Sequence, residues 1–203
     1  MTWKETFSGR RIDLLDPDPA QITLDDIAKG LSGTNRFTGH TLHIENVARH
    51  SLYVLMLVEE QYPDDHLLIA LAGAHDAHEA YTGDISRPMK LALRALGSNA
   101  LDHIEALVQA ACLMSLGLPP PSEAQKLIIK AADTRMLVTE RRALMPNTGA
   151  NRWETETIQP HPQLLELLQD PALVFTPTTW EKLFIATMNL ALFRLRDAHK
   201  PPW

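Results

Sequence analysis

The sequence predicts an all-α fold, a helical bundle with short extended segments near the N-terminus. Long apolar or amphipathic stretches recur along the chain, and residues that start or end helices flank most of them. No segment alternates apolar and polar side chains for long enough to form a large sheet, and no internal repeat is visible. The 203 residues, 45% of them hydrophobic, suffice for one substantial core, so we expect a single domain over residues 1–203.

The N-terminal part is expected to contain extended segments and one helix. Residues 1–23 are rich in turn-forming residues and have room for at most a short strand. Thr23 can cap a helix that begins at residue 24 and ends near Gly33. The segment "NRFTGHTLHIEN" after it has no helical period, and we interpret it as extended chain or loop.

The rest of the chain is predicted to be mainly helical. Ser122 and Gln125 have capping-box spacing at the start of a helix of about six turns. A polar connector follows this helix and precedes the last two. From their apolar pattern, we expect the other helices over residues 47–62, 66–82, 99–116, 162–169 and 179–198.

Charge and composition exclude several classes of protein. A formal net charge of −6 argues against a nucleic-acid or anionic-membrane surface, which normally needs a strong positive excess. Cys112, the single cysteine, rules out an internal disulfide and fits a reducing cytosol. No apolar run is long enough for a membrane span and no signal peptide is visible, so we expect a cytoplasmic protein.

Titratable residues lie inside the apolar helices. If residues 66–82 are helical, His75 and Glu79 share one face and Asp76 follows about 100° around the helix. Asp133 lies in the middle of "IIKAADTRMLV", where an ionised carboxylate is costly unless it meets a cation or several donors. Two imidazoles and two carboxylates, a set suited to one divalent Mn, Fe, Co, Ni or Zn ion, come from His50, His75, Asp76 and Asp133. The alternative is that these four are ordinary buried hydrogen-bonding groups.

The same residues resemble a known signature. His50 in "ARHSL", the pair His75-Asp76 after "LAGA" and Asp133 in "AADTRM" look like the H…HD…D motif of HD-domain metal-dependent phosphohydrolases. The segment "HDAHEAYTGDISRPMK" is similar to bacterial HD-domain 5′-deoxynucleotidases, and the N-terminal stretch is similar to phage HD hydrolases that include dATP triphosphohydrolases. The resemblance covers about residues 8–145 and implies an HD-domain bundle with a catalytic core over about 24–145.

The resemblance also implies roles for residues around the ligand set. Glu79 and Asp84 would act at the reacting phosphate, although the sequence does not decide which is the acid and which the base. Arg36 would bind phosphate and Phe37 would pack against the sugar, at a position where the family usually has tryptophan. Lys90 would supply a second positive charge; the alternative is a solvated surface lysine.

These features favour a metal-dependent phosphohydrolase acting on a small deoxynucleotide, most simply a 5′-deoxynucleotidase. A divalent ion would activate water and neutralise charge on the phosphate. The main rival is a deoxynucleoside triphosphohydrolase, and from another class comes a non-catalytic nucleotide-sensing module. We expect no nucleic-acid or membrane partner. We expect a homo-oligomer with the helix at 179–198 or the helix at 99–116 in the interface, because the first of these is apolar around more of its circumference than one core contact requires.

Overall fold

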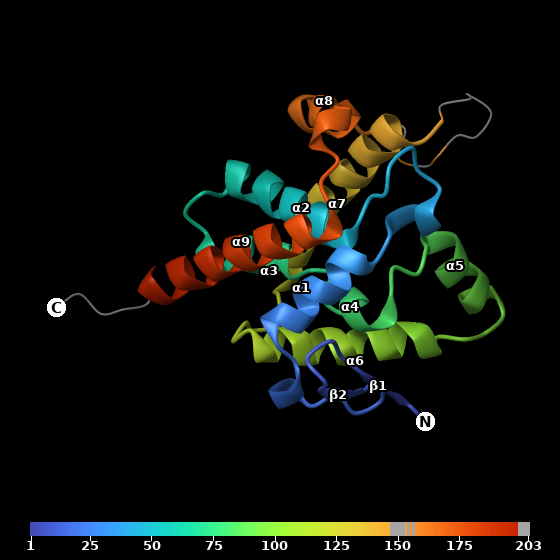
Figure 1. Cartoon of the computed structure of the whole chain (residues 1–203), viewed down its shortest axis with the longest axis vertical. Helices are drawn as coiled ribbons and strands as arrows, with labels where there is room; N and C mark the ends of the chain where they lie inside the picture. Colours follow the sequence, from blue (N-terminus) through green and yellow to red (C-terminus); the bar gives the residue numbers. More distant parts are fainter. Residues whose placement is uncertain (147–152, 154, 156, 199–203) are drawn as a thin grey trace.

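The computed structural model describes residues 1–146, 153, 155 and 157–198, and it confirms the all-α prediction (Figure 1). The only sheet in the described part of the chain is an antiparallel pair, β1 (Trp3–Glu5) and β2 (Arg11–Asp13). The α-helices found among these residues are α1 (Leu24–Gly33), α2 (Val47–Gln61), α3 (His66–Gly73), α4 (Glu79–Thr82), α5 (Arg87–Ala95), α6 (Ala100–Ser115), α7 (Glu123–Leu144), α8 (Pro162–Gln169) and α9 (Pro177–Ala198). Short 3-10 turns lie at Pro19–Gln21, Arg36–Gly39 and Pro171–Leu173.

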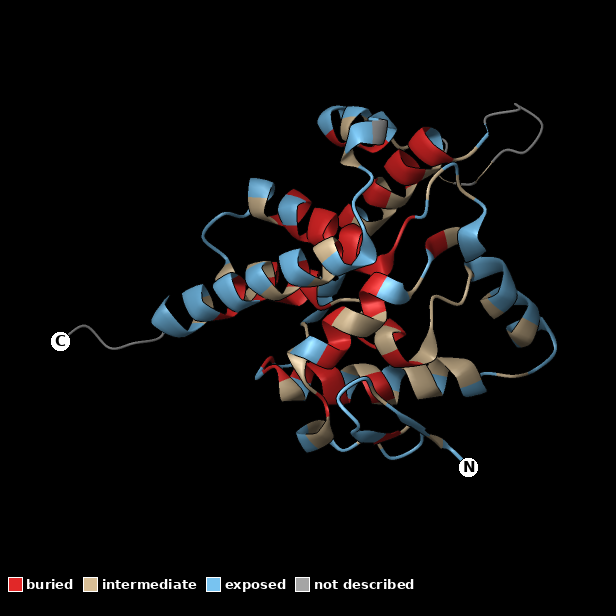
Figure 2. Cartoon of the chain, viewed as in Figure 1, coloured by how far each residue is buried: buried red, intermediate tan, exposed pale blue. Residues whose placement is uncertain are grey.

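Helices α2 and α3 form the centre of the bundle. Helix α2 packs against α3, α7 and α9, and Figure 2 shows buried residues concentrated where the helices meet. A Cβ atom at Gly73 would lie 2.5 Å from Met188 Sδ and 2.7 Å from Leu55 Cδ1, so glycine lets α3 approach both neighbours closely. In the same way, a Cβ at Gly30 would lie 2.6 Å from the Ala80 carbonyl oxygen, so glycine allows α1 to pack tightly against α4.

The N-terminal caps of α1 and α7 were predicted correctly. The Thr23 hydroxyl accepts a hydrogen bond from the Asp26 amide at the start of α1. Ser122 and Gln125 form the reciprocal capping box of α7, which runs for 22 residues. Both signals depend on residues three apart in the sequence, so they operate wherever the helix packs.

The prediction of one continuous helix over 66–82 is wrong. Helix α3 ends at Gly73, residues 74–78 form a tight turn, and α4 begins only at Glu79. Two amide groups in the turn bond three residues back instead of four, His75 N to Ala72 O at 3.4 Å and Ala77 N to Ala74 O at 3.2 Å. His75 and Asp76 therefore lie on a turn between two helices.

Two further regions differ from or add to the sequence prediction. In the segment predicted as loop, Asn35 pairs with Asn46 in an isolated bridge, and the enclosed turn holds Phe37 and Thr38 at positive φ of 54° and 53°. Helix α5, which the sequence did not predict, lies at the periphery in Figure 1. Within the described residues, no helix is both long and apolar enough to cross a bilayer.

Candidate metal centre

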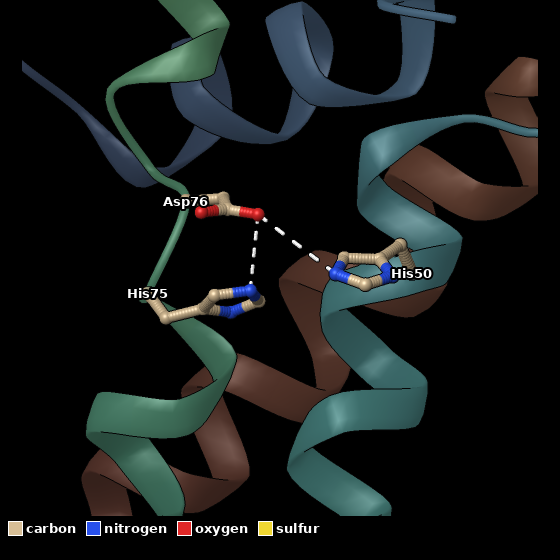
Figure 3. Close-up of side chains that lie close together, drawn as sticks. All are labelled: His50, His75 and Asp76. Atoms are coloured by element: carbon tan, nitrogen blue, oxygen red, sulfur yellow. Dashed lines mark ion pairs between the residues drawn. The ribbon is translucent and has the colours of Figure 1, made fainter. Parts of the chain in front are cut away.

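Three predicted ligands meet where α2 faces the turn between α3 and α4 (Figure 3). His75 Nε2 lies 3.0 Å from Asp76 Oδ2, and His50 Nε2 lies 3.8 Å from the same oxygen. The ligand atoms of the three residues all lie within 4.8 Å of one another. This group of His50, His75 and Asp76 could hold a metal ion.

Asp133, the fourth predicted ligand, approaches this group from α7 through a contact with His50. Its Oδ1 lies 3.2 Å from His50 Nε2, and its Oδ2 accepts a hydrogen bond of 2.6 Å from Lys130 Nζ. The Nε2 atoms of His50 and His75 are buried and, among the described residues, neither has a hydrogen-bond partner of acceptable geometry. Unpartnered imidazole nitrogens beside carboxylate oxygens are what a cation site requires, so His50, His75 and Asp76 fit a metal ion.

The other ring nitrogen of each histidine is engaged. His75 Nδ1 lies 2.8 Å from the Ala72 carbonyl oxygen, which can only accept, so Nδ1 carries the proton. His50 Nδ1 lies 2.8 Å from Glu140 Oε1 in a fully buried contact. Carbonyl and carboxylate partners of this kind fix the ring orientation of metal-ligating histidines and raise their basicity. Both histidines consequently direct Nε2 to the shared centre.

Charge around His50 favours a cation strongly. Burial and Arg36 lower the pKa of His50, but Glu140 and Asp133 outweigh them and raise it to about 10. Burial would raise the pKa of Asp133, yet the close contact with His50 and the charge of that imidazole hold it well below the usual range. Without a metal ion, a proton on His50 therefore balances these carboxylates, and metal binding would release it.

Arg36, the predicted phosphate ligand, lies beside the centre with a carboxylate partner. Its Nε and one terminal nitrogen each lie 3.0 Å from Glu140 Oε2, and both side chains are buried. Burial would raise the pKa of Glu140, but Arg36 and His50 together hold it below its ordinary value. The result is a buried chain from Arg36 through Glu140 to His50. Phosphate binding by Arg36 stays a prediction.

Glu79 and Asp84 flank the ligand group on and after α4. Burial raises the pKa of Glu79 to about 10, and the carboxylates of Asp76 and Asp84 act in the same direction. Its Oε2 is buried and has no hydrogen-bond partner in the described chain. Burial and then Asp76 likewise raise the pKa of Asp84, although Arg36 opposes them. A protonated Glu79 could donate a hydrogen bond at neutral pH, whereas an ionised carboxylate could not.

The two other predicted substrate contacts are placed less directly. Lys90, on α5, pairs with Glu105 at 3.0 Å and is partly exposed. Phe37 is half-buried, with the Arg36 guanidinium 5.5 Å from its ring centre and the ring of Trp153 at 6.4 Å. Their contacts with substrate stay predictions.

Sequence reasoning missed Glu140 and Gln109. Glu140 follows Asp133 by seven residues, two helical turns, so their shared face was a usable signal. Gln109 from α6 donates through Nε2 to the Ala74 carbonyl at 2.8 Å and accepts at Oε1 from the His78 amide at 3.0 Å. A polar residue next to buried Val108 was the available sign of its role.

Comparison with known proteins identifies two relatives, while no protein-family model matches the chain. The chain is 34% identical over 152 residues to the uncharacterized protein YfdR of Escherichia coli (strain K12), an alignment that covers 74% of this chain and 76% of YfdR. It is 40% identical over 136 residues to the uncharacterized protein RCAP_rcc00048 of Rhodobacter capsulatus, covering 65% of this chain and 67% of that protein. The similarity to YfdR extends over most of both chains.

Proposed function

The chain belongs to the family of the Escherichia coli protein YfdR, and we propose that it is a metal-dependent phosphohydrolase of the HD-domain type. The observation that carries the proposal is the convergence of buried, unpartnered imidazole nitrogens with carboxylate oxygens from separate segments. We assign one divalent ion, such as Mn, Co, Zn, Fe or Ni, to this centre, with the ligands His50, His75, Asp76 and Asp133.

The groups around the centre suit hydrolysis of a phosphate ester. A divalent ion bound there would supply activated water and Lewis-acid stabilisation of the phosphate. Burial raises the pKa of Glu79 to about 10 in the metal-free protein, and in its protonated form Glu79 would donate a hydrogen bond to a phosphate oxygen or a proton to the leaving oxygen. Asp84, half-buried beside it, would accept a proton from the attacking water.

The proposed substrate is a small deoxynucleotide, most simply a 5′-monophosphate. This choice rests on the resemblance of "HDAHEAYTGDISRPMK" to bacterial HD-domain 5′-deoxynucleotidases. Arg36 would contact the phosphate while it stays paired with Glu140, because a guanidinium has five N–H donors. Lys90 would leave its ion pair with Glu105 and bind the phosphate instead.

A product assay tests this function. The protein, purified without chelator, is supplied with Mn, Co or Zn and given deoxynucleoside mono- and triphosphates. We expect inorganic phosphate from the monophosphates. Release of tripolyphosphate from dATP would identify the triphosphohydrolase alternative, whereas metal and nucleotide binding without turnover would identify a sensing module. Absence of stoichiometric metal by elemental analysis would refute the metal centre itself.

The proposed assembly is a homo-oligomer that covers the outer face of α9. Trp180 and Phe184 of this helix are buried in the bundle, but Leu183, Leu190 and Phe193 are 40%, 48% and 59% exposed. A large apolar face of this kind is usually covered by a partner. Light scattering should give a multiple of the 22.7 kDa chain mass, and Phe193→Glu should reduce that mass. A single-chain mass at micromolar concentrations would reject the assembly.

A further inference from the structure

The adjacent ligands His75 and Asp76 depend on an interrupted helix. In a regular helix, successive side chains diverge by about 100°. The structure instead places His75 Nε2 3.0 Å from Asp76 Oδ2, because residues 74–78 leave the helical path. The Ala74 carbonyl still accepts from the Ala77 amide at 3.2 Å, but the His78 amide loses its helical acceptor at this break and needs another partner.

Gln109 occupies the position of the missing helical bond. In an unbroken helix the His78 amide would donate to the Ala74 carbonyl, four residues back. Here the amide of Gln109 lies between the two groups, since Nε2 donates to Ala74 O at 2.8 Å and Oε1 accepts from His78 N at 3.0 Å. Oε1 also lies 3.2 Å from His78 Nδ1. Insertion of a side chain into the helical hydrogen-bond ladder is a recognised cause of kinks.

We propose that Gln109 is a positioning residue. Its side-chain amide keeps the segment between α3 and α4 out of a regular helix, so that His75 and Asp76 can bind the same metal ion. Its hydrogen bonds to Ala74 O and His78 N act through the backbone on either side of the two ligands. The inference rests on the metal-binding part of the proposed function and is independent of the substrate. Gln109 comes from α6, to which the resemblance assigned no functional residue.

Replacement of Gln109 by an apolar residue has a specific expected result. In Gln109→Leu, the Ala74 carbonyl and the His78 amide can bond directly, so the helix closes and the two ligand side chains diverge. A residue that merely stabilised the fold would lower the melting temperature of the metal-free protein and leave metal affinity intact. Loss of a positioning residue has the opposite result. The affinity for Mn falls about 10- to 100-fold, the range for partners that orient metal ligands, while the melting temperature of the metal-free protein changes little.

The experiment is calorimetric titration of Mn into wild type, Gln109→Leu and Gln109→Glu, with Gln169→Leu as the matched exchange at an exposed glutamine on α8. Glutamate keeps the acceptor for the His78 amide but loses the donor to Ala74 O, so we expect an intermediate loss of affinity. A structure of metal-free Gln109→Leu should show His78 N–H bonded to the Ala74 carbonyl.

The outcomes separate the two proposals. If wild type does not bind Mn or Co, the metal centre is refuted. If wild type binds and Gln109→Leu binds equally tightly, Gln109 has no positioning role. If Gln109→Leu does not fold, Gln109→Glu decides by the same comparison, because unchanged affinity in that variant also overturns the role.

Discussion

The metal centre and helix α5 are held in place in opposite ways. Around the centre, His50 and Glu140 are fully buried and each makes close contacts inside the bundle. None of the residues of α5, all of which the structure describes, is buried. It contacts α6 through ion pairs from Lys90 and Arg94, and Arg94 is largely exposed. Buried contacts fix the ligands, whereas α5 is joined to the bundle by contacts that water and salt weaken.

The largest effect should follow from breaking the ligand group. Asp133→Asn keeps the side-chain shape but removes the charge opposite His50 Nε2. We expect loss of stoichiometric metal and a fall of phosphohydrolase activity to background, measured by elemental analysis and phosphate release. Asp102→Asn, on the surface of α6, is the control. Retention of activity and metal by Asp133→Asn would exclude Asp133 as a ligand.

A second change should stop the chemistry and leave the metal in place. Glu79→Gln keeps a hydrogen-bond donor but cannot transfer a proton, so we expect turnover to fall about 10²- to 10⁴-fold. Metal content should match wild type, and Glu166→Gln on α8 should behave as wild type in both assays. Normal turnover in Glu79→Gln would show that Glu79 transfers no proton in the rate-limiting step.

Glu140→Gln tests the buried chain behind His50. Glutamine still offers an oxygen to His50 Nδ1, but Arg36 loses its anionic partner. We expect metal affinity to fall about 10- to 100-fold. Breaking a buried ion pair leaves a charge unpaired, which should cost about 3–5 kcal/mol in the free energy of unfolding. Titration calorimetry and urea unfolding measure the two effects, and unchanged values in both would remove Glu140 from the site.

The raised pKa of Glu79 predicts a pH-dependent effect on the stability of the metal-free protein. Its pKa rises from 4.5 to about 10 on folding, so between these values the folded state binds more protons than the unfolded state. This contribution is fully present below pH 4.5 and is lost as pH rises toward 10. Metal-free Glu79→Gln should therefore gain stability relative to wild type at pH 8 and show little difference at pH 4. Equal pH profiles for the two proteins would contradict the buried, protonated state.

The smallest effect is expected at α5. Arg94→Ala removes the exposed pair with Asp102, so the melting temperature and metal affinity should stay within experimental error of wild type. A large loss in either measurement would mean that α5 supports the metal centre and that the contrast between the two regions is wrong.

Features that depend on residues close together in the sequence could be predicted, and those that depend on residues far apart in the sequence could not. The caps at Thr23 and Ser122 act within one helical turn, and the helices they start were found. The break after Gly73 was missed because it depends on Gln109, 35 residues beyond Ala74. The contact between His50 and Glu140 spans 90 residues and was missed for the same reason. The ligand types were visible in the sequence, but the groups that orient them depend on packing.

The left-handed turn at Phe37 and Thr38 stores conformational energy at the edge of the site. The left-handed conformation costs roughly 1–2 kcal/mol for each residue with a Cβ atom, and here two such residues occur in succession. The Asn35–Asn46 bridge and the bond from Arg36 N to Glu45 O at 2.8 Å close the base of the loop and hold the two residues in this conformation. Loss of these contacts would let both residues leave the left-handed region, and it would release Arg36, the arginine that neutralises Glu140.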